Sequence, residues 1–342
     1  MTDLRRRVLT VAAGAAVAAP FAMGLAAGAE PDDGRVLFTF ADPEVVESSG
    51  LVAAGDRAWT TNDSGDTGRV FTVDSTTGET VGVTYWADGP VDVEALAPAG
   101  PGRVWVGDIG DNAAARDSIR VTRVPVGDGD RTVDEETLDL VYPDGARDAE
   151  ALLVHPTTGR LHVVTKGVFA GEVYAAPPEP ADDAPNQLGL VGQVVGLVTD
   201  GAFFPDGRHV VLRTYSRATV YTFPDLESLG SWDLPAQQQG EGIAVTPEGG
   251  LLISSEGQRS EVLAVGIPPR IERAMAGTTP AATAPTSTSS SASSSPPGPS
   301  PDGGTVAQDV FTPPDADAWP WAVGGVVGVL ALGVLWRSLR PH

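Results

Sequence analysis

The chain has 342 residues, a formal net charge of −23 at pH 7, 42% hydrophobic residues and no cysteine. The acidic balance argues against nucleic acid as a partner, because binding to phosphates needs clustered Lys and Arg, and these are few and scattered in this chain. The absence of cysteine excludes disulfides and thiolate metal sites, so burial of a hydrophobic core has to stabilise the fold.

Residues 1–29 are typical of an export signal. Arg5, Arg6 and Arg7 form a basic start, an uncharged and Ala-rich stretch follows, and Ala27-Gly28-Ala29 supplies the small residues that a signal peptidase reads. The three arginines, followed by Val8-Leu9, also resemble a twin-arginine signal. An ordinary secretory signal and an uncleaved anchor are the alternatives.

A second apolar segment lies near the C-terminal end. Residues 318–336 carry no charge and have Trp at both ends, which predicts one transmembrane helix. Arg337 and Arg340 follow it, so we expect residues 337–342 to form a cytoplasmic tail. Residues 276–317 are rich in Ser, Thr, Pro and Ala and predict a disordered stalk. The predicted protein is therefore a single-pass cell-membrane protein with an extracytoplasmic head and with the membrane as a partner through its C-terminal helix.

The remaining region, residues 30–275, contains an internal repeat. Five segments each place a polar or small residue, then Gly or Ala, then a large apolar residue, and these apolar residues are Leu51, Leu96, Leu152, Phe203 and Ile243. They are separated by 45, 56, 51 and 40 residues, which is the period of propeller blades.

Each copy continues into a turn rich in Gly, Pro and Asp and then into a second β-type run, which favours an all-β fold, a β-propeller. The orphan run 36–40 precedes the first copy, and we expect it to pair into the last blade and close the ring. Five blades is the best count. A sixth blade hidden between Asp128 and Asp148, or a two-sheet sandwich, is the alternative.

Acidic residues begin several of these copies. In a propeller the start of the innermost strand and the end of the second strand meet at one mouth of the central channel, so Glu94, Glu150 and Glu241 are predicted to share one rung. Carboxylates held together need a compensating cation, and Ca²⁺ takes six to eight oxygen ligands. The candidate metal ligands are Glu94, Asp108, Glu150 and Glu241, with calcium as the candidate cofactor.

Other polar residues at the same strand ends are candidates for binding a protein or small-molecule ligand at the channel mouth: Asn62, Asp63, Asp111, Lys166, Arg213 and Glu256. Two alternatives remain open at this point. Lys166 and Arg213 could pair with the carboxylates in place of a metal, and the polar residues could instead hydrogen-bond neighbouring blades and hold the ring in register.

Motifs of several enzyme classes are absent from the sequence, including the Gly-x-Ser-x-Gly elbow, the phosphate-binding Gly-Lys-Ser/Thr loop, the His-Glu-x-x-His pair and the dinucleotide fingerprint. A binding protein is therefore favoured over an enzyme. The alternative is a metal-dependent hydrolase in which a bound cation polarises a phosphoryl or carbonyl oxygen.

Three motifs resemble segments of uncharacterised exported β-propeller proteins of an actinobacterial type: Asn62-Asp63-Ser64-Gly65, 107–112 and Asp148-Ala149-Glu150-Ala151-Leu152. The Glu-Ala-Leu and Glu-Gly-Ile starts are also distantly similar to phytase-like and WD40-like propellers. The phytase resemblance implies channel carboxylates that hold calcium and a phytase-like or lactonase-like hydrolase as the alternative activity. The apparent blade count and the Ser49 and Gly201 positions depart from the calcium-phytase pattern, so phosphomonoesterase activity is not carried over, and fold alone does not establish function.

Overall fold

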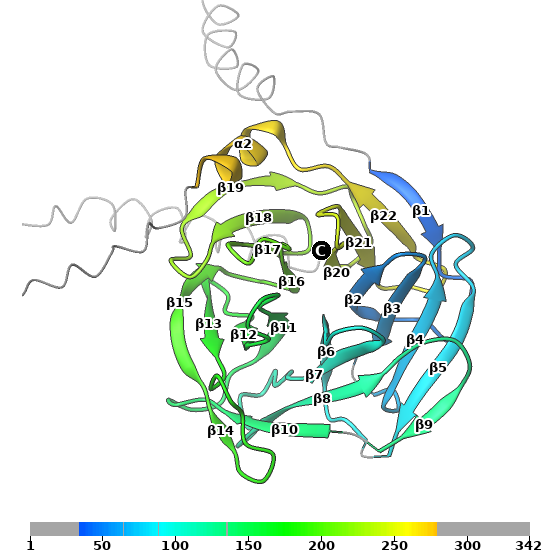
Figure 1. Ribbon diagram of the computed structural model, residues 1–342, viewed down its shortest axis with the longest axis horizontal. Coiled ribbons are helices and arrows are strands. Elements are labelled where there is room, and N and C mark those ends of the chain that lie inside the picture. Colours follow the sequence, from blue (N-terminus) through cyan, green and yellow to red (C-terminus); the bar gives the residue numbers. More distant parts are fainter. Residues whose placement is uncertain (1–33, 64, 88, 135, 279–342) are drawn as a thin grey trace, which may run out of the picture. The chain divides into compact units, whose positions relative to one another are not determined.

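The strands are arranged as five sheets around a common centre, and the first four strands of each sheet from the centre outwards are antiparallel, as the computed structural model shows (Figure 1). The structure describes residues 34–278 except Ser64, Asp88 and Glu135. The predicted signal peptide, the stalk beyond residue 278, the transmembrane helix and the cytoplasmic tail lie outside these residues. Within the described part of the chain, no helix is long and apolar enough to cross a membrane.

Each sheet is one blade, with its innermost strand at the centre of the ring. From the centre outwards, blade 1 consists of β2 (Ser48–Ala54), β3 (Arg57–Asn62), β4 (Arg69–Asp74), β5 (Thr80–Trp86) and β9 (Arg131–Val133). In the same direction, blade 2 consists of β6 (Val93–Pro98), β7 (Arg103–Asp108), β8 (Ile119–Pro125), β10 (Glu136–Val141) and β14 (Asn186–Gln187). Blade 3 consists of β11 (Ala149–Val154), β12 (Leu161–Thr165), β13 (Ala170–Ala175) and β15 (Gly189–Val195).

Blade 4 consists of β16 (Asp200–Phe203), β17 (His209–Arg213), β18 (Arg217–Thr222) and β19 (Ser228–Asp233). Blade 5 consists of β20 (Gly240–Val245), β21 (Leu251–Ser255), β22 (Glu261–Val265) and β1 (Arg35–Thr39). The innermost strands β2, β6, β11, β16 and β20 contact one another in this cyclic order, with β20 returning to β2. The predicted five-bladed propeller is confirmed.

The ring is closed by the strand that begins the described chain. β1 pairs antiparallel with β22, the third strand of the last blade, as the orphan run in the sequence predicts. The stretch between Asp128 and Asp148 supplies outer strands and no sixth blade. β9 adds to β5 in parallel and β10 is the fourth strand of blade 2, so part of this stretch crosses back to the preceding blade.

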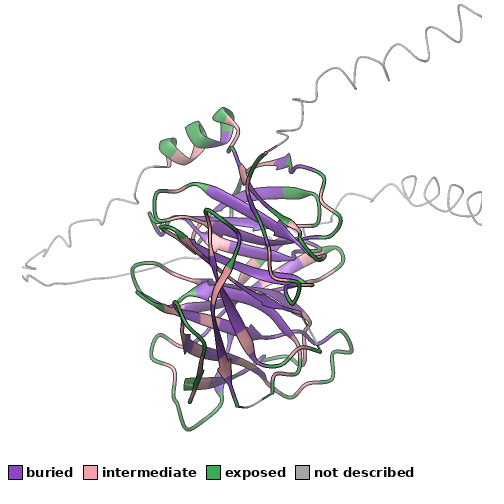
Figure 2. Ribbon diagram, turned by 90° about the vertical axis from the view of Figure 1, so that its right-hand side faces the viewer, coloured by how far each residue is buried: buried purple, intermediate pink, exposed green. Residues whose placement is uncertain are grey.

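The hydrophobic core lies between the blades, as five clusters that each join two neighbours. Side chains alternate along a strand, so Leu51 and Ala53 of β2 pack toward blade 5 while Val52 packs toward blade 2. Both faces of a blade are thus buried, which explains why the inner strands are continuous apolar runs (Figure 2). The helix α2 (Pro269–Gly277) adds Ile271, fully buried, to the cluster between blades 4 and 5.

Candidate functional site: the carboxylate mouth

Irregular pairing at the start of the inner strands positions the acidic side chains. In β6, Val93 pairs with Asp108 and Ala95 pairs with Gly107, so Glu94 has no partner on β7. Glu150 is skipped in the same way between β11 and β12, and Glu241 lies in the corresponding shift of β20. Such a β-bulge re-aims the extra residue away from the regular ladder.

The same shift occurs in β2, where Ser49 and Gly50 occupy it, whereas β16 pairs regularly through Gly201. Gly50 is required because a Cβ there would lie 2.2 Å from the backbone nitrogen of Leu96 in the next blade. Ser49 donates a hydrogen bond to the Glu94 carbonyl oxygen (2.7 Å) across the same boundary. The bulges therefore allow close packing between neighbouring blades and direct the side chain of the unpaired residue out of the regular sheet.

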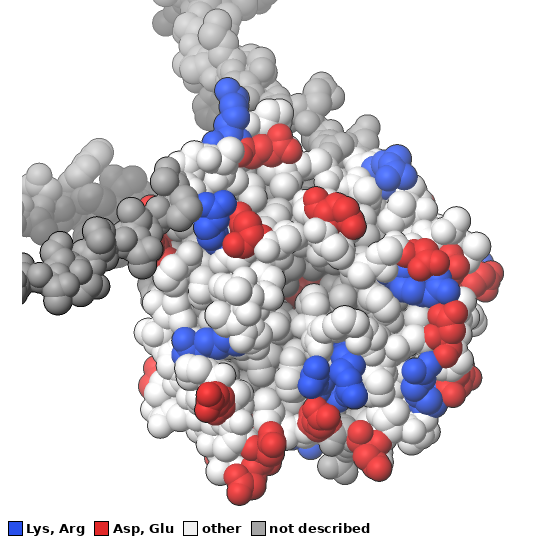
Figure 3. All heavy atoms as spheres, viewed as in Figure 1, with Lys and Arg blue, Asp and Glu red and all other residues white. Residues whose placement is uncertain are grey.

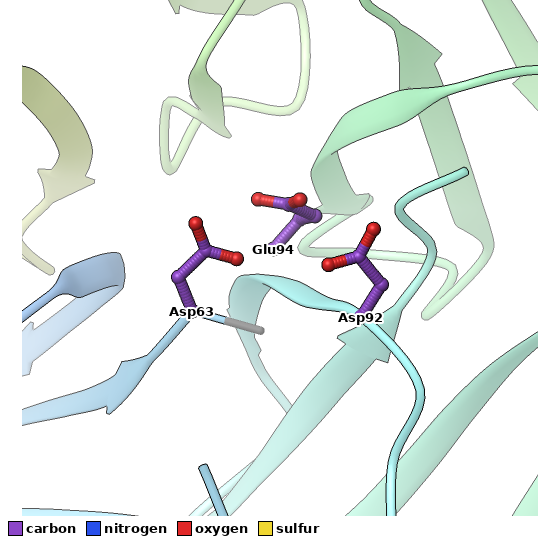
Figure 4. A group of neighbouring side chains, drawn as sticks. All are labelled: Asp63, Asp92 and Glu94. Atoms are coloured by element: carbon purple, nitrogen blue, oxygen red, sulfur yellow. The ribbon is translucent and has the colours of Figure 1, made fainter. Parts of the chain in front are cut away.

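Three carboxylates converge at this mouth of the channel, which we call the carboxylate mouth. Asp63 directly follows β3, Asp92 directly precedes β6, and Glu94 lies in the bulge of β6. One oxygen of each lies within 4.8 Å of the others, and the side chains point toward one shared space (Figure 4). Gly110 lines this space closely, since a Cβ there would lie 2.4 Å from an Asp92 oxygen and 2.7 Å from a Glu94 oxygen.

Burial makes this cluster electrostatically costly. Glu94 is only 5% exposed. Burial, followed by the negative charges of Glu150, Asp63 and Asp92, raises its pKa to about 10. Burial also raises the pKa of Asp92, and Asp63 adds to that effect. Neither Asp92 nor Glu94 forms an ion pair with a residue in the described part of the chain. A positive charge placed among these oxygens would favour their ionised forms.

The next carboxylate around the ring has a partner of its own. Glu150 accepts a short hydrogen bond from the Lys166 ammonium group (2.6 Å), and Lys166 Nζ lies 5.3 Å from the centre of the Tyr215 ring. Burial raises the pKa of Glu150 to about 8 against the opposing effect of Lys166. Burial by itself would lower the pKa of Lys166, but Glu150 raises it, so the lysine stays positively charged.

Glu241, the third carboxylate of the rung, is 4% exposed, and burial raises its pKa to about 7. Its Oε2 atom is buried and accepts no hydrogen bond from any described residue. Glu256 lies close by at the end of β21, where Gln239 donates a hydrogen bond to it (2.6 Å). Burial raises the pKa of Glu256 as well. The predicted rung of Glu94, Glu150 and Glu241 therefore occupies equivalent bulges. The charge of Glu150 raises the pKa of Glu94 and the charge of Glu241 raises the pKa of Glu150, while Lys166 acts against the rise at all three carboxylates.

Three of the candidate residues, Asp108, Asp111 and Asn62, have other partners. Asp108 forms ion pairs with Arg116 (2.9 Å) and Arg120 (3.0 Å) and also accepts from the Asp92 backbone N–H, so its oxygens are already engaged. Asp111 accepts hydrogen bonds from the backbone N–H groups of Ala115 and Arg116. The Asn62 side chain bridges backbone groups of the 44–47 segment.

Arg213 is fully buried and does not open onto the mouth. Its Nη1 donates to the carbonyl oxygens of Gly242 (2.8 Å) and Ser254 (3.0 Å) in blade 5. Asp200, its cross-strand neighbour, accepts from the Ile243 N–H (2.8 Å) in the same blade. For Arg213 and Asp200 the interpretation that polar groups hold neighbouring blades in register describes the geometry best.

Asp92 belongs to the cluster but was not among the candidate residues predicted from the sequence. Asp63 was predicted only as a ligand-binding residue and not as a metal ligand. The sequence does contain a signal for both, because Asp63 ends the second strand of blade 1 and Asp92 precedes Glu94 by two positions. The bulge could not be read from the sequence, since it depends on how β6 pairs with β7. No protein-family model matches the chain, and comparison with curated proteins gives no significant match.

Proposed function

We propose that the protein is an exported, membrane-anchored β-propeller that binds a cationic ligand at its carboxylate mouth, with Ca²⁺ as the first candidate. The observation that carries the proposal is the convergence of one oxygen each from Asp63, Asp92 and Glu94 within 4.8 Å. Hard divalent cations prefer such carboxylate oxygens. The buried Oε2 atom of Glu241 on the same rung, which has no hydrogen-bond partner among the described residues, also supports the proposal.

Calorimetric titration of the purified full-length protein with Ca²⁺ tests this function. We expect saturable binding in the wild type and loss of binding in Glu94→Gln, which keeps the shape of the side chain but cannot ionise when a cation binds. Glu248→Gln, an exposed acid in a turn of blade 5, is the matched control and should bind as the wild type does. The absence of any heat from the wild type would refute the cation site.

A Ca²⁺-dependent hydrolase is the second candidate function. The Lys166–Glu150 pair beside the carboxylate cluster favours it, because a positively charged donor next to a metal could bind a phosphoryl or carboxylate oxygen of a substrate. Assays with a phosphomonoester and a lactone, with and without Ca²⁺, separate the two functions. Turnover that depends on Ca²⁺ and is lost in Lys166→Met supports the hydrolase, whereas calcium binding without turnover supports the binding protein.

Export and anchoring are part of the proposal and are supported by the sequence of residues 1–29, 276–317 and 318–336. A chain that ends before Ala318 should be released from the membrane, while the full-length chain should sediment with it. Protease added to intact cells should cut the full-length protein in the stalk. Recovery of the full-length chain in the cytosolic fraction would contradict both.

A further inference from the structure

The opposite mouth of the channel differs in its chemistry. It opens into a cavity of about 720 Å³, which we call the turn-side cavity. All five inner strands line it with their second halves, and the turns that follow them complete the wall. The cavity is therefore the far end of the same central channel, and Figure 3 shows a face hollowed at its centre, with charged side chains mostly on its outer part.

The lining of the turn-side cavity is apolar. The residues of its wall include Leu51, Leu96, Leu153, Phe203, Trp59 and Trp105. Small-molecule sites typically have volumes of about 300 to 1,000 Å³ and are lined by aliphatic and aromatic side chains with a few polar groups. Both the size and the lining of this cavity fall within that description.

The charged residues of the wall are all basic, although the chain as a whole has a net charge of −23. Arg103 and Arg123 line the cavity, and no Asp or Glu does. Arg103 forms no ion pair with any residue in the described ranges. Arg123 lies over the Trp105 ring (5.9 Å), donates to the Ala99 carbonyl oxygen (3.0 Å) and forms a partly exposed ion pair with Glu136 (3.6 Å). Its Nε atom is buried with no hydrogen-bond partner among the described residues.

We propose that the turn-side cavity binds a small amphipathic carboxylate, with the apolar part of the ligand between the inner strands and its anionic group at Arg103 and Arg123. Carboxylates pair with arginine through charge-assisted hydrogen bonds, and the fork of donors on Arg favours this geometry. This site is independent of the cation site, because the two lie at opposite ends of the inner strands.

Titration of the full-length protein with dodecanoate, followed by the fluorescence of the tryptophans, tests the proposal, since Trp59 and Trp105 line the cavity. We expect saturable binding of dodecanoate and binding of uncharged dodecanol that is at least about tenfold weaker, as the loss of one charge-assisted hydrogen bond implies. Equal binding of both ligands would overturn the assignment of the anionic group.

Two variants localise the binding. Ala202→Trp fills the cavity from β16 and should abolish binding, and the double variant Arg103→Gln, Arg123→Gln should weaken dodecanoate about tenfold or more and leave dodecanol unchanged. Arg208→Gln, which changes an arginine in a turn of blade 4 outside the cavity wall, is the matched control. Wild-type affinity in both cavity variants would overturn the site, and the double variant keeps the test valid if Ala202→Trp does not fold.

The last experiment measures binding of the protein to vesicles of phosphatidylglycerol, because an anionic group on an apolar chain could also come from a lipid. The proposal requires that free dodecanoate binds to the protein in the absence of vesicles. Binding to vesicles without any binding of free dodecanoate would overturn it in favour of a lipid surface.

Discussion

Replacement of Arg213 by Met tests whether the buried charge network between blades 4 and 5 stabilises the ring. The substitution keeps most of the side-chain length and removes the donors to Gly242 and Ser254. Burial lowers the pKa of Arg213 to about 10, so the side chain is positively charged at neutral pH. Met leaves two buried carbonyl oxygens without this donor and Asp200 without its positive neighbour, and breaking such a buried network costs about 3 to 5 kcal/mol.

Equilibrium unfolding in urea measures this cost, and a loss of this size should also lower the melting temperature by about 10 °C for a domain of this length. Arg217→Met is the matched control: the ion pair of Arg217 with Asp233 (2.9 Å) joins side chains that are 51% and 68% exposed, and such pairs contribute less than about 1 kcal/mol. If the two variants lose the same free energy of unfolding, the interpretation of Arg213 as a connection between blades is refuted.

Three further predictions concern ring closure, blade spacing and pH. Phe40→Ala should lower the free energy of unfolding by about 3 to 5 kcal/mol, because Phe40 is fully buried beside β1. Val36→Ala, at a site 47% exposed, is the control and should change the free energy of unfolding by less than about 1 kcal/mol. Equal urea midpoints for the two variants would contradict the role of β1 in closing the ring. Gly50→Ala should destabilise by at least about 2 kcal/mol because its Cβ meets the backbone of blade 2, while Gly89→Ala, which meets nothing within 4 Å, should be nearly neutral in thermal unfolding. Burial lowers the pKa of His162 from 6.5 to about 4, so the unfolded chain binds a proton that the folded chain does not, and stability should fall by about 3 kcal/mol as the pH falls from about 6.5 to 4. His162→Leu should show a shallower decline over that range, and an unchanged slope of stability against pH would show that His162 is not its source.

The repeat made the fold predictable from the sequence. Five similar starts at blade-like spacing, each followed by a turn and a second apolar run, indicate a propeller because every blade has to bury both faces in the same way. Even the closure by residues 36–40 could be inferred, since an unpaired strand at one end and a short copy at the other complement each other. The outer strands β9 and β14 could not be inferred, because each is short and pairs in parallel with a strand far from it in the chain.

The candidate site was predictable in part. Glu94, Glu150 and Glu241 lie at equivalent positions, as the alignment of the repeats suggests. The partners of Asp108 and Arg213 were not predictable, because both are determined by contacts across strands and blades: Arg116 and Arg120 approach Asp108 from the following loop and strand, and the acceptors of Arg213 are backbone carbonyls. The sequence alone does not show whether a charged residue at a strand end faces the channel mouth or a neighbouring blade.

The bulges at the start of the inner strands have a consequence for how such a protein can change. Glu94 and Glu150 have no partner in the ladder, so their identity can vary with little effect on the pairing of β6 with β7 or of β11 with β12. Ser49 occupies the equivalent place in blade 1, and blade 4 has Gly201 without a bulge. The side chains of the carboxylate mouth could therefore be changed one blade at a time, by substitution at these positions, on a scaffold that stays the same.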